Sequence, residues 1–167
     1  LYPELTKLAL NHAGGNAISK TDILDVIGLS REYNVFELQN ALESGNVTKT
    51  LNIGARMAEQ KGYSIIPLIA LLAGFYSRIY IVKSLGPTSA NAIGEAIGNK
   101  SPFFINKNKE AARKYSLDTI EKCIGWLHVY DMKSKGWQYS GGDDRALTIE
   151  LLDRLLFPDN YPVFAEN

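Results

Sequence analysis

The sequence predicts an all-α protein, and three observations lead to this fold class. Apolar residues recur at the three- and four-residue spacing of a helix face along most of the chain. Capping residues such as Ser, Thr and Asn precede many of these stretches, and Gly or Pro follows them. No stretch shows the sustained two-residue alternation of a strand. Because 46% of the 167 residues are hydrophobic, the chain can bury one complete core.

The longest apolar stretch spans residues 65–85, and we expect it to form the central helix. Its apolar side chains cover almost the whole circumference, and such a helix must be buried by neighbouring helices or by lipid. Ser77 and Arg78 interrupt the apolar run after about a dozen residues, whereas a membrane span needs roughly 20. We therefore expect burial inside a helical domain. Ser64 is placed to cap the first turn, where Pro67 is tolerated.

Two short helices are predicted near the beginning of the chain, over residues 2–12 and 22–27. Thr21 can cap the second of them, and Gly28 can stop it. Residues 30–33 are polar and form the expected boundary between two domains.

A helical hairpin is predicted next, over residues 35–44 and 47–61. Asn34 and Asn46 are the expected N-caps, and a glycine follows each helix. The side chains expected to face inward are Phe36, Leu38, Ala41, Leu42, Leu51, Ala55 and Ala58.

Four more helices are predicted after the central one. A short helix runs from Thr88 or Ser89 to Gly98, and the others cover residues 103–114, 116–135 and 145–157. The side chains expected to face inward in the last two are Leu117, Ile120, Cys123, Ile124, Trp126, Leu127, Tyr130, Leu147, Leu151, Leu152 and Leu155.

Charge and cysteine content restrict the class of protein. The 18 basic and 18 acidic residues cancel, so no net charge attracts the whole molecule to nucleic acid or to a membrane. Residues 100–135 carry eight Lys or Arg and four acids, whereas residues 138–167 carry two and six. The single cysteine, Cys123, lies in an apolar stretch and fits a packed thiol in a reducing compartment. We expect a cytoplasmic protein.

The sequence offers no catalytic, cofactor-binding or metal site, so we do not expect an enzyme. His12 and His128 lie far apart, and neither belongs to the histidine–glutamate pattern of zinc proteases. There is no glycine-rich phosphate loop. Asp143 and Asp144 are expected at the beginning of a helix, where acids complement the helix dipole, rather than in a metal site.

Asp131 lies where the apolar stripe of the 116–135 helix would next reach the core. A half-buried carboxylate needs a partner, and Lys135, four residues later, is placed to supply one. We expect a structural ion pair between Asp131 and Lys135, with contact to another protein as the alternative.

The segment after Gly136 is the expected ligand contact. Trp137 and Tyr139 follow Lys133 and Lys135, and aromatic faces beside cations are used to stack unpaired bases. These four residues are therefore the candidates for contact with DNA. The alternative is that Trp137 closes the core over the helix end.

Residues 92–104 predict a short helix, a glycine turn and the beginning of a second helix, as in a helix-turn-helix. The second helix would then present Asn106, Lys107 and Lys109 to a major groove. This pattern supports an alternative function as a sequence-specific DNA-binding regulator. A general helical scaffold is the third possibility.

Three segments, taken together and in order, resemble one family. They are residues 35–62, beginning Val-Phe-Glu-Leu-Gln-Asn-Ala-Leu, residues 101–116, which contain Ser-Pro-Phe-Phe and Ala-Ala-Arg-Lys-Tyr-Ser, and residues 131–136, Asp-Met-Lys-Ser-Lys-Gly. In this order and at these distances they resemble the delta subunit of bacterial DNA polymerase III, a clamp-loader subunit.

The resemblance implies a layout and a role. Residues 1–32 would be the end of a small helical lid domain of an AAA+-like module, and residues 33–167 an antiparallel helical bundle, the collar domain. The collar would join the other loader subunits into a ring, without ATP hydrolysis, so that the sliding clamp is loaded on primer-template DNA during replication. The sliding clamp would be contacted only by an N-terminal domain that this chain lacks, and no membrane would be involved.

Overall fold

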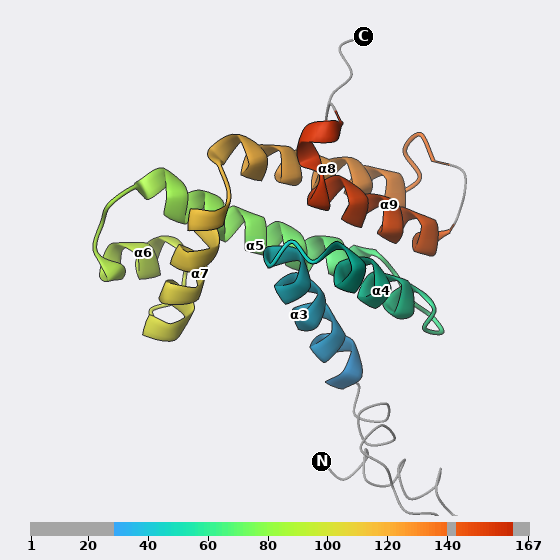
Figure 1. Ribbon diagram of the computed structural model, residues 1–167, viewed down its shortest axis with the longest axis horizontal. Coiled ribbons are helices and arrows are strands. Elements are labelled where there is room, and N and C mark those ends of the chain that lie inside the picture. Colours follow the sequence, from blue (N-terminus) through green and yellow to red (C-terminus); the bar gives the residue numbers. More distant parts are fainter. Residues whose placement is uncertain (1–28, 140–142, 162–167) are drawn as a thin grey trace, which may run out of the picture.

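The computed structural model describes residues 29–139 and 143–161 (Figure 1). Within these ranges the chain is entirely helical, without a strand, so the predicted all-α class is confirmed. The helices are α3 (Leu29–Glu43), α4 (Val47–Ala58), α5 (Ile66–Leu85), α6 (Ala90–Ala96), α7 (Pro102–Lys114), α8 (Leu117–Ser134) and α9 (Asp144–Leu156), followed by the short 3-10 helix η1 (Pro158–Asn160).

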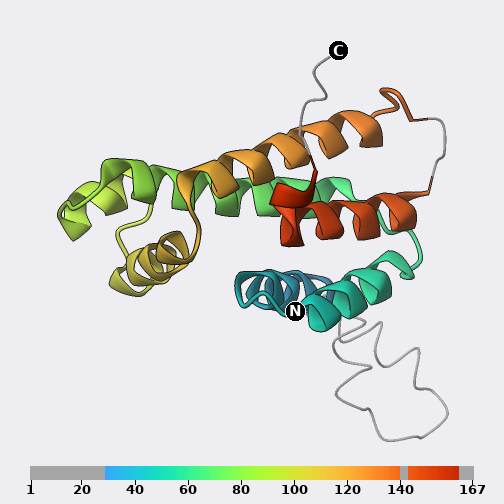
Figure 2. The same cartoon turned by 45° about the horizontal axis from the view of Figure 1, so that its top comes forward.

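Helix α5 is the axis of the fold, as predicted. It packs against α8 on one side and against α6 and α7 towards its C-terminal end, while α9 joins α8 to α4 (Figure 2). Helix α4 in turn packs against α3. The buried side chains of α5 come from most of its circumference: Leu68, Ile69, Leu72, Phe75, Tyr76, Ile79 and Val82.

The beginning of α5 differs from the prediction in one detail. Ile65, not Ser64, holds the N-cap position, so the predicted cap is wrong by one residue. The Ser64 hydroxyl accepts the backbone N–H of Ile66 at 3.3 Å, and the backbone N–H of Ile65 donates to the Asp144 carboxylate at 3.1 Å. A carboxylate from α9 therefore fixes the beginning of α5.

Helix α5 is also the one described helix whose length and composition would allow it to span a membrane. The argument that Ser77 and Arg78 make it too short is wrong, because the helix runs unbroken for 20 residues. Its apolar side chains are instead part of the core that α7, α8 and α9 complete.

The hairpin of α3 and α4 forms, but α3 begins earlier than predicted. Asn34 lies inside a helix that starts at Leu29 and therefore does not cap it. Asn46 is an N-cap as predicted, since its side chain accepts the backbone N–H of Lys49 at 2.9 Å. Gly45 makes the turn with φ +66°, a left-handed conformation that favours glycine. The predicted helices over residues 2–12 and 22–27 lie outside the described residues, and the division at residue 32 stays a prediction.

The inward faces of α3 and α4 differ in part from those predicted from the sequence. Leu38, Ala41 and Leu42 are buried as expected, but Phe36 is 54% exposed. In α4 the buried residues are Thr50, Gly54 and Met57, one position before the predicted Leu51, Ala55 and Ala58, which are half-buried. The helix turns this way because Gly54 lets it approach the Leu152 side chain of α9.

The inward faces of α8 and α9 follow the prediction closely. All four leucines predicted for α9 are buried, and α8 buries Ile120, Cys123, Trp126, Leu127 and Tyr130. The two differences are Leu117, which is exposed, and Ile124, which is half-buried. Leu117 is the first residue of α8, where the preceding turn does not cover it.

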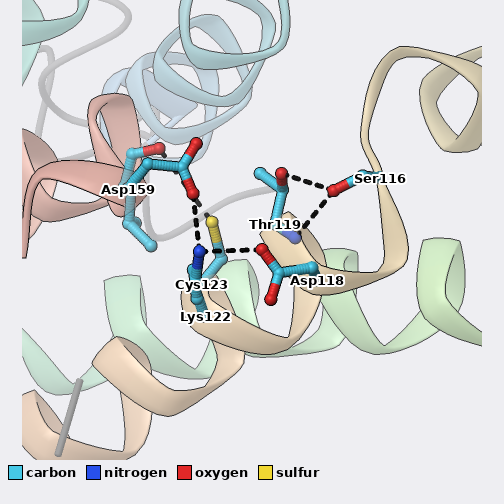
Figure 3. A network of polar contacts seen from close by, with 7 residues as sticks. Ser116, Asp118, Thr119, Lys122, Cys123 and Asp159 are labelled. Atoms are coloured by element: carbon cyan, nitrogen blue, oxygen red, sulfur yellow. Dashed lines mark hydrogen bonds and ion pairs between the residues drawn. The ribbon is translucent and has the colours of Figure 1, made fainter. Parts of the chain in front are cut away.

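A small polar network holds η1 against α8 (Figure 3). Lys122 Nζ lies 2.7 Å from the carboxylates of both Asp118 and Asp159. The hydrogen bond to Asp118, and to a smaller extent the one to Asp159, raises the pKa of Lys122 well above its usual value. Beside it, the Ser116 hydroxyl caps α8 by accepting the backbone N–H of Thr119.

The buried thiol of Cys123 and the half-buried phenol of Tyr115 predict that the fold weakens at alkaline pH. Burial raises the pKa of Cys123 from 9.0 to about 12 and the pKa of Tyr115 from 10.0 to about 12. Above about pH 9 the unfolded chain therefore holds fewer protons than the folded one, and the free energy of unfolding falls as the pH rises. Urea unfolding at about pH 8 and about pH 10.5 should show this loss, and Cys123→Ala should reduce it. Equal stability at both pH values would contradict the burial of these groups.

The contact of α4 with α9 at Gly54 gives a second prediction. Gly54→Val should lower the free energy of unfolding by about 1–3 kcal/mol, because a side chain there overlaps with Leu152 in a filled core. Ala55→Val is the matched control, since it places the same β-branched residue at a half-buried position of the same helix. Urea unfolding measures both variants, and an equal effect would show that the α4–α9 contact is not tight.

Candidate functional site

The predicted DNA-contact residues lie at the end of α8, where both lysines already have partners. Lys135 Nζ lies 2.6 Å from Asp131 Oδ2, so the expected ion pair forms. Lys133 Nζ lies 3.5 Å from Glu150 Oε1 of α9 and 4.6 Å from the centre of the Tyr130 ring. Both cations are thus held close to the protein surface by neighbouring residues, rather than extending freely towards a ligand.

The two aromatic residues of this segment differ in their environments. Gly136, with φ +93°, ends α8, and the backbone N–H of Trp137 returns to the carbonyl of Met132. Trp137 is 49% exposed and is not among the side chains that pack on the core, so the interpretation that it closes the core is wrong. Tyr139 does pack on the core, and its hydroxyl donates to the Asp143 carbonyl at 3.4 Å. Only Trp137 offers an open ring face for stacking within this group of four.

The corner of α6 and α7, the alternative DNA-binding element, belongs to a basic part of the molecule. Residues 78–114 contain seven Lys or Arg and two Glu. Asn106 is exposed, as a base-reading residue must be. Lys107 instead reaches across to α3, where its Nζ donates to Asn40 Oδ1 at 3.2 Å.

A pocket of about 370 Å³ lies on the other side of α7, between this helix and the end of α5. Lys83, Lys109 and Arg113 line it together with apolar residues such as Ile93. Lys83 Nζ donates to the Ala112 carbonyl at 3.0 Å. Among the described residues, no carboxylate pairs with any of these three cations, so the pocket has a positive potential.

A groove that was not predicted from the sequence lies between α3 and α7. It has a volume of about 200 Å³, and the residues that line it include Phe36, Phe75, Arg78, Phe103, Phe104 and Lys107. Phe103 is 79% exposed, the highest value among the exposed large hydrophobic residues of the described chain. The sequence signal was present in the pair Phe103-Phe104 directly after Pro102, but only the fold brings it next to Phe36.

The titratable residues form no metal site in the described part of the chain, because no three of its His, Cys, Asp and Glu residues are grouped to hold an ion. His12 lies outside the described residues. Asp143 and Asp144 begin α9 as expected: the Asp143 side chain accepts the backbone N–H of Arg145 at 2.9 Å, and Asp144 accepts from Ile65.

Comparison of the chain with protein-family models, curated proteins and solved structures finds no match.

The two tryptophans should respond differently to substitution. Trp137→Ala should change the free energy of unfolding by less than about 0.5 kcal/mol, because half of the ring is in solvent. Trp126→Ala should lower it by about 3–5 kcal/mol, because this ring is buried and lies under the Arg154 guanidinium. Urea unfolding measures both. A large effect of Trp137→Ala would restore the interpretation that this ring closes the core.

Proposed function

We propose that this chain is a non-catalytic part of a clamp-loader subunit similar to the delta subunit of bacterial DNA polymerase III. Its role would be to assemble with other loader subunits in the cytoplasm, so that the sliding clamp is opened and loaded on primed DNA. Residues 33–167 would form the collar, and residues 1–32 the end of the lid domain. The clamp itself would be contacted by an N-terminal domain outside this chain.

The observation that carries the proposal is the placement of large apolar side chains on the surface of an all-helical fold. Phe36, Phe103 and Trp137 are each about half exposed or more, although the molecule has a well-filled core in α5, α8 and α9. Exposed aromatic residues are enriched where proteins associate. This pattern favours a protein that is covered by neighbouring subunits.

Contact with primer-template DNA would take place at the end of α8. Trp137 is 49% exposed, and Lys133 and Lys135 lie four and two residues before it in the sequence. Base stacking contributes roughly 1–3 kcal/mol per base, and exposed ion pairs such as Asp131–Lys135 are weak enough to exchange for a phosphate. Tyr139 would hold the segment after Gly136 in place, because its side chain packs on the core.

A second function, sequence-specific binding of duplex DNA, is favoured by one observation. The surplus of basic residues between positions 78 and 114 lies on α7, on the turn that precedes it and on the second half of α5. A protein that uses this surface would bind duplex DNA on its own, with an affinity that falls steeply with salt because each phosphate contact releases counterions.

One set of measurements distinguishes these functions. The chain mixed with purified loader subunits should elute with them in size-exclusion chromatography. In the reassembled loader, Trp137→Ala combined with Tyr139→Ala should weaken primer-template binding by about 10-fold or more. Phe157→Ala is the matched control, since it removes an exposed aromatic ring that follows α9 rather than α8, and the nearest basic residue in the sequence, Arg154, already pairs with Glu150.

The outcomes are separable. Failure to elute with loader subunits contradicts the proposed function, and an unchanged affinity of the double variant removes only the contact at the end of α8. Salt-dependent binding of duplex DNA by the chain alone, lost in Lys109→Ala and Arg113→Ala, would support the DNA-binding regulator. Recovery of proteins unrelated to replication would support a general scaffold.

A further inference from the structure

The groove between α3 and α7 has the form of a binding site for a peptide segment. Both views place α3 and α7 on the same side of α5, and residues of α5 form the floor between them (Figures 1 and 2). Lys107 joins the two walls through its hydrogen bond to Asn40. At about 200 Å³ the groove is smaller than the roughly 300–1,000 Å³ of ordinary small-molecule pockets, but it can take one or two side chains.

The rims of the groove are aromatic. Phe36 of α3 is 54% exposed, and Phe103 of α7 is 79% exposed. Single apolar side chains on a surface are common, but here two exposed phenylalanines line the same groove. Together they can pack against a large apolar side chain of a partner.

The floor of the groove carries a positive charge, and no carboxylate in the described part of the chain pairs with it. The Arg78 guanidinium lies 5.5 Å from the centre of the Phe104 ring, and its Nε is buried without a hydrogen-bond partner. None of the described residues that line the groove is acidic. Burial lowers the pKa of Arg78 from its usual value, which shows that the charged form is partly desolvated there.

The two acids of α3 whose side chains the structure describes, Glu37 and Glu43, have partners other than Arg78. Glu37 pairs with Lys49 at 3.0 Å, and Glu43 accepts a hydrogen bond from Gln39 at 2.7 Å. A buried guanidinium N–H without a hydrogen-bond acceptor destabilises the protein. A carboxylate or carbonyl of a ligand would accept this hydrogen bond and so favour binding. The groove therefore complements a ligand that combines an acceptor with an apolar side chain.

We propose that the groove binds a segment of a partner protein in which a carboxylate lies within two residues of a large apolar side chain. The apolar side chain packs between Phe36 and Phe103, and the carboxylate pairs with Arg78, with Lys107 as the second cation. The occupant is acidic because the described lining of the groove includes two cations, Arg78 and Lys107, and no acid. This inference goes beyond the proposed function, since the groove would accept such a segment whether or not the partner is a loader subunit.

The test uses the 167-residue chain and three fluorescent, amidated hexapeptides that differ only in charge. The first has the sequence Glu-Phe-Glu-Leu-Phe-Glu, and in the other two Gln or Lys replaces each Glu. Anisotropy should show the acidic peptide bound at least about 10-fold more tightly than the Gln peptide, because charge-assisted hydrogen bonds are lost in the latter. The Lys peptide should bind more weakly still.

Variants locate the binding in the groove. Phe103→Ser should weaken binding of the acidic peptide by about 10-fold or more, and it removes a side chain that is mostly in solvent, so the fold is not at risk. Arg78→Met should reduce the difference between the acidic and Gln peptides to about twofold or less. Trp137→Ser and Lys109→Met are matched controls, since they remove an exposed aromatic ring and a cation outside the groove. Both controls should bind as the native chain does.

Several results would overturn the proposal. These are equal binding of the three peptides, acidic-peptide binding that Phe103→Ser leaves unchanged, and no binding below about 1 mM. Competition by a single-stranded oligonucleotide that is lost in Arg78→Met would assign the groove to nucleic acid. Concentration-dependent dimerisation abolished by Phe103→Ser, measured by sedimentation, would assign it to a second copy of the chain.

Discussion

The structure depends on the burial of one helix that is apolar on nearly every side. No single neighbouring helix can bury α5, because its buried side chains point in several directions around its axis. Helices α8 and α7 therefore cover different parts of it, and α9 and α4 extend the core outward from α8. The order in which the helices pack follows from this requirement.

The covering of α5 is incomplete between α3 and α7, and this gap gives the groove its character. Arg78 emerges from the central helix at that point, next to Gly74, where the lack of a side chain leaves room for the guanidinium. The side chain is half-buried, and its charge is offset in part by the face of the Phe104 ring. An arginine that would be a surface residue on an ordinary helix thus becomes the floor of a concave surface.

The sequence predicted most helices and many of their ends, because these depend on local chemistry. The caps at Asn46, Ser89 and Ser116 and the glycine turns at Gly45 and Gly136 need only neighbouring backbone groups. The predicted cap at Asn34 was wrong because the helix continues through this residue. In a sequence, a polar residue inside a helix looks the same as an N-cap. The predicted inward face of α4 was wrong because the small residue Gly54, rather than the large residue Leu51, makes the close contact with α9.

The candidate sites were predicted less well, because they depend on residues far apart in the chain. The Asp131–Lys135 pair follows from a spacing of four on one helix, so the sequence shows it directly. The partners of Lys133, by contrast, include Glu150 of another helix, and the groove combines Phe36, Arg78 and Phe103 from three. Sequence spacing shows which residues share a helix face but not which faces meet. One feature of the sequence does indicate a site of this kind: a charged residue in a central apolar helix. The fold must place this charge at the edge of the core, because burying it completely costs too much free energy. A cation at the edge of the core without a paired carboxylate is then a place where a partner can bind.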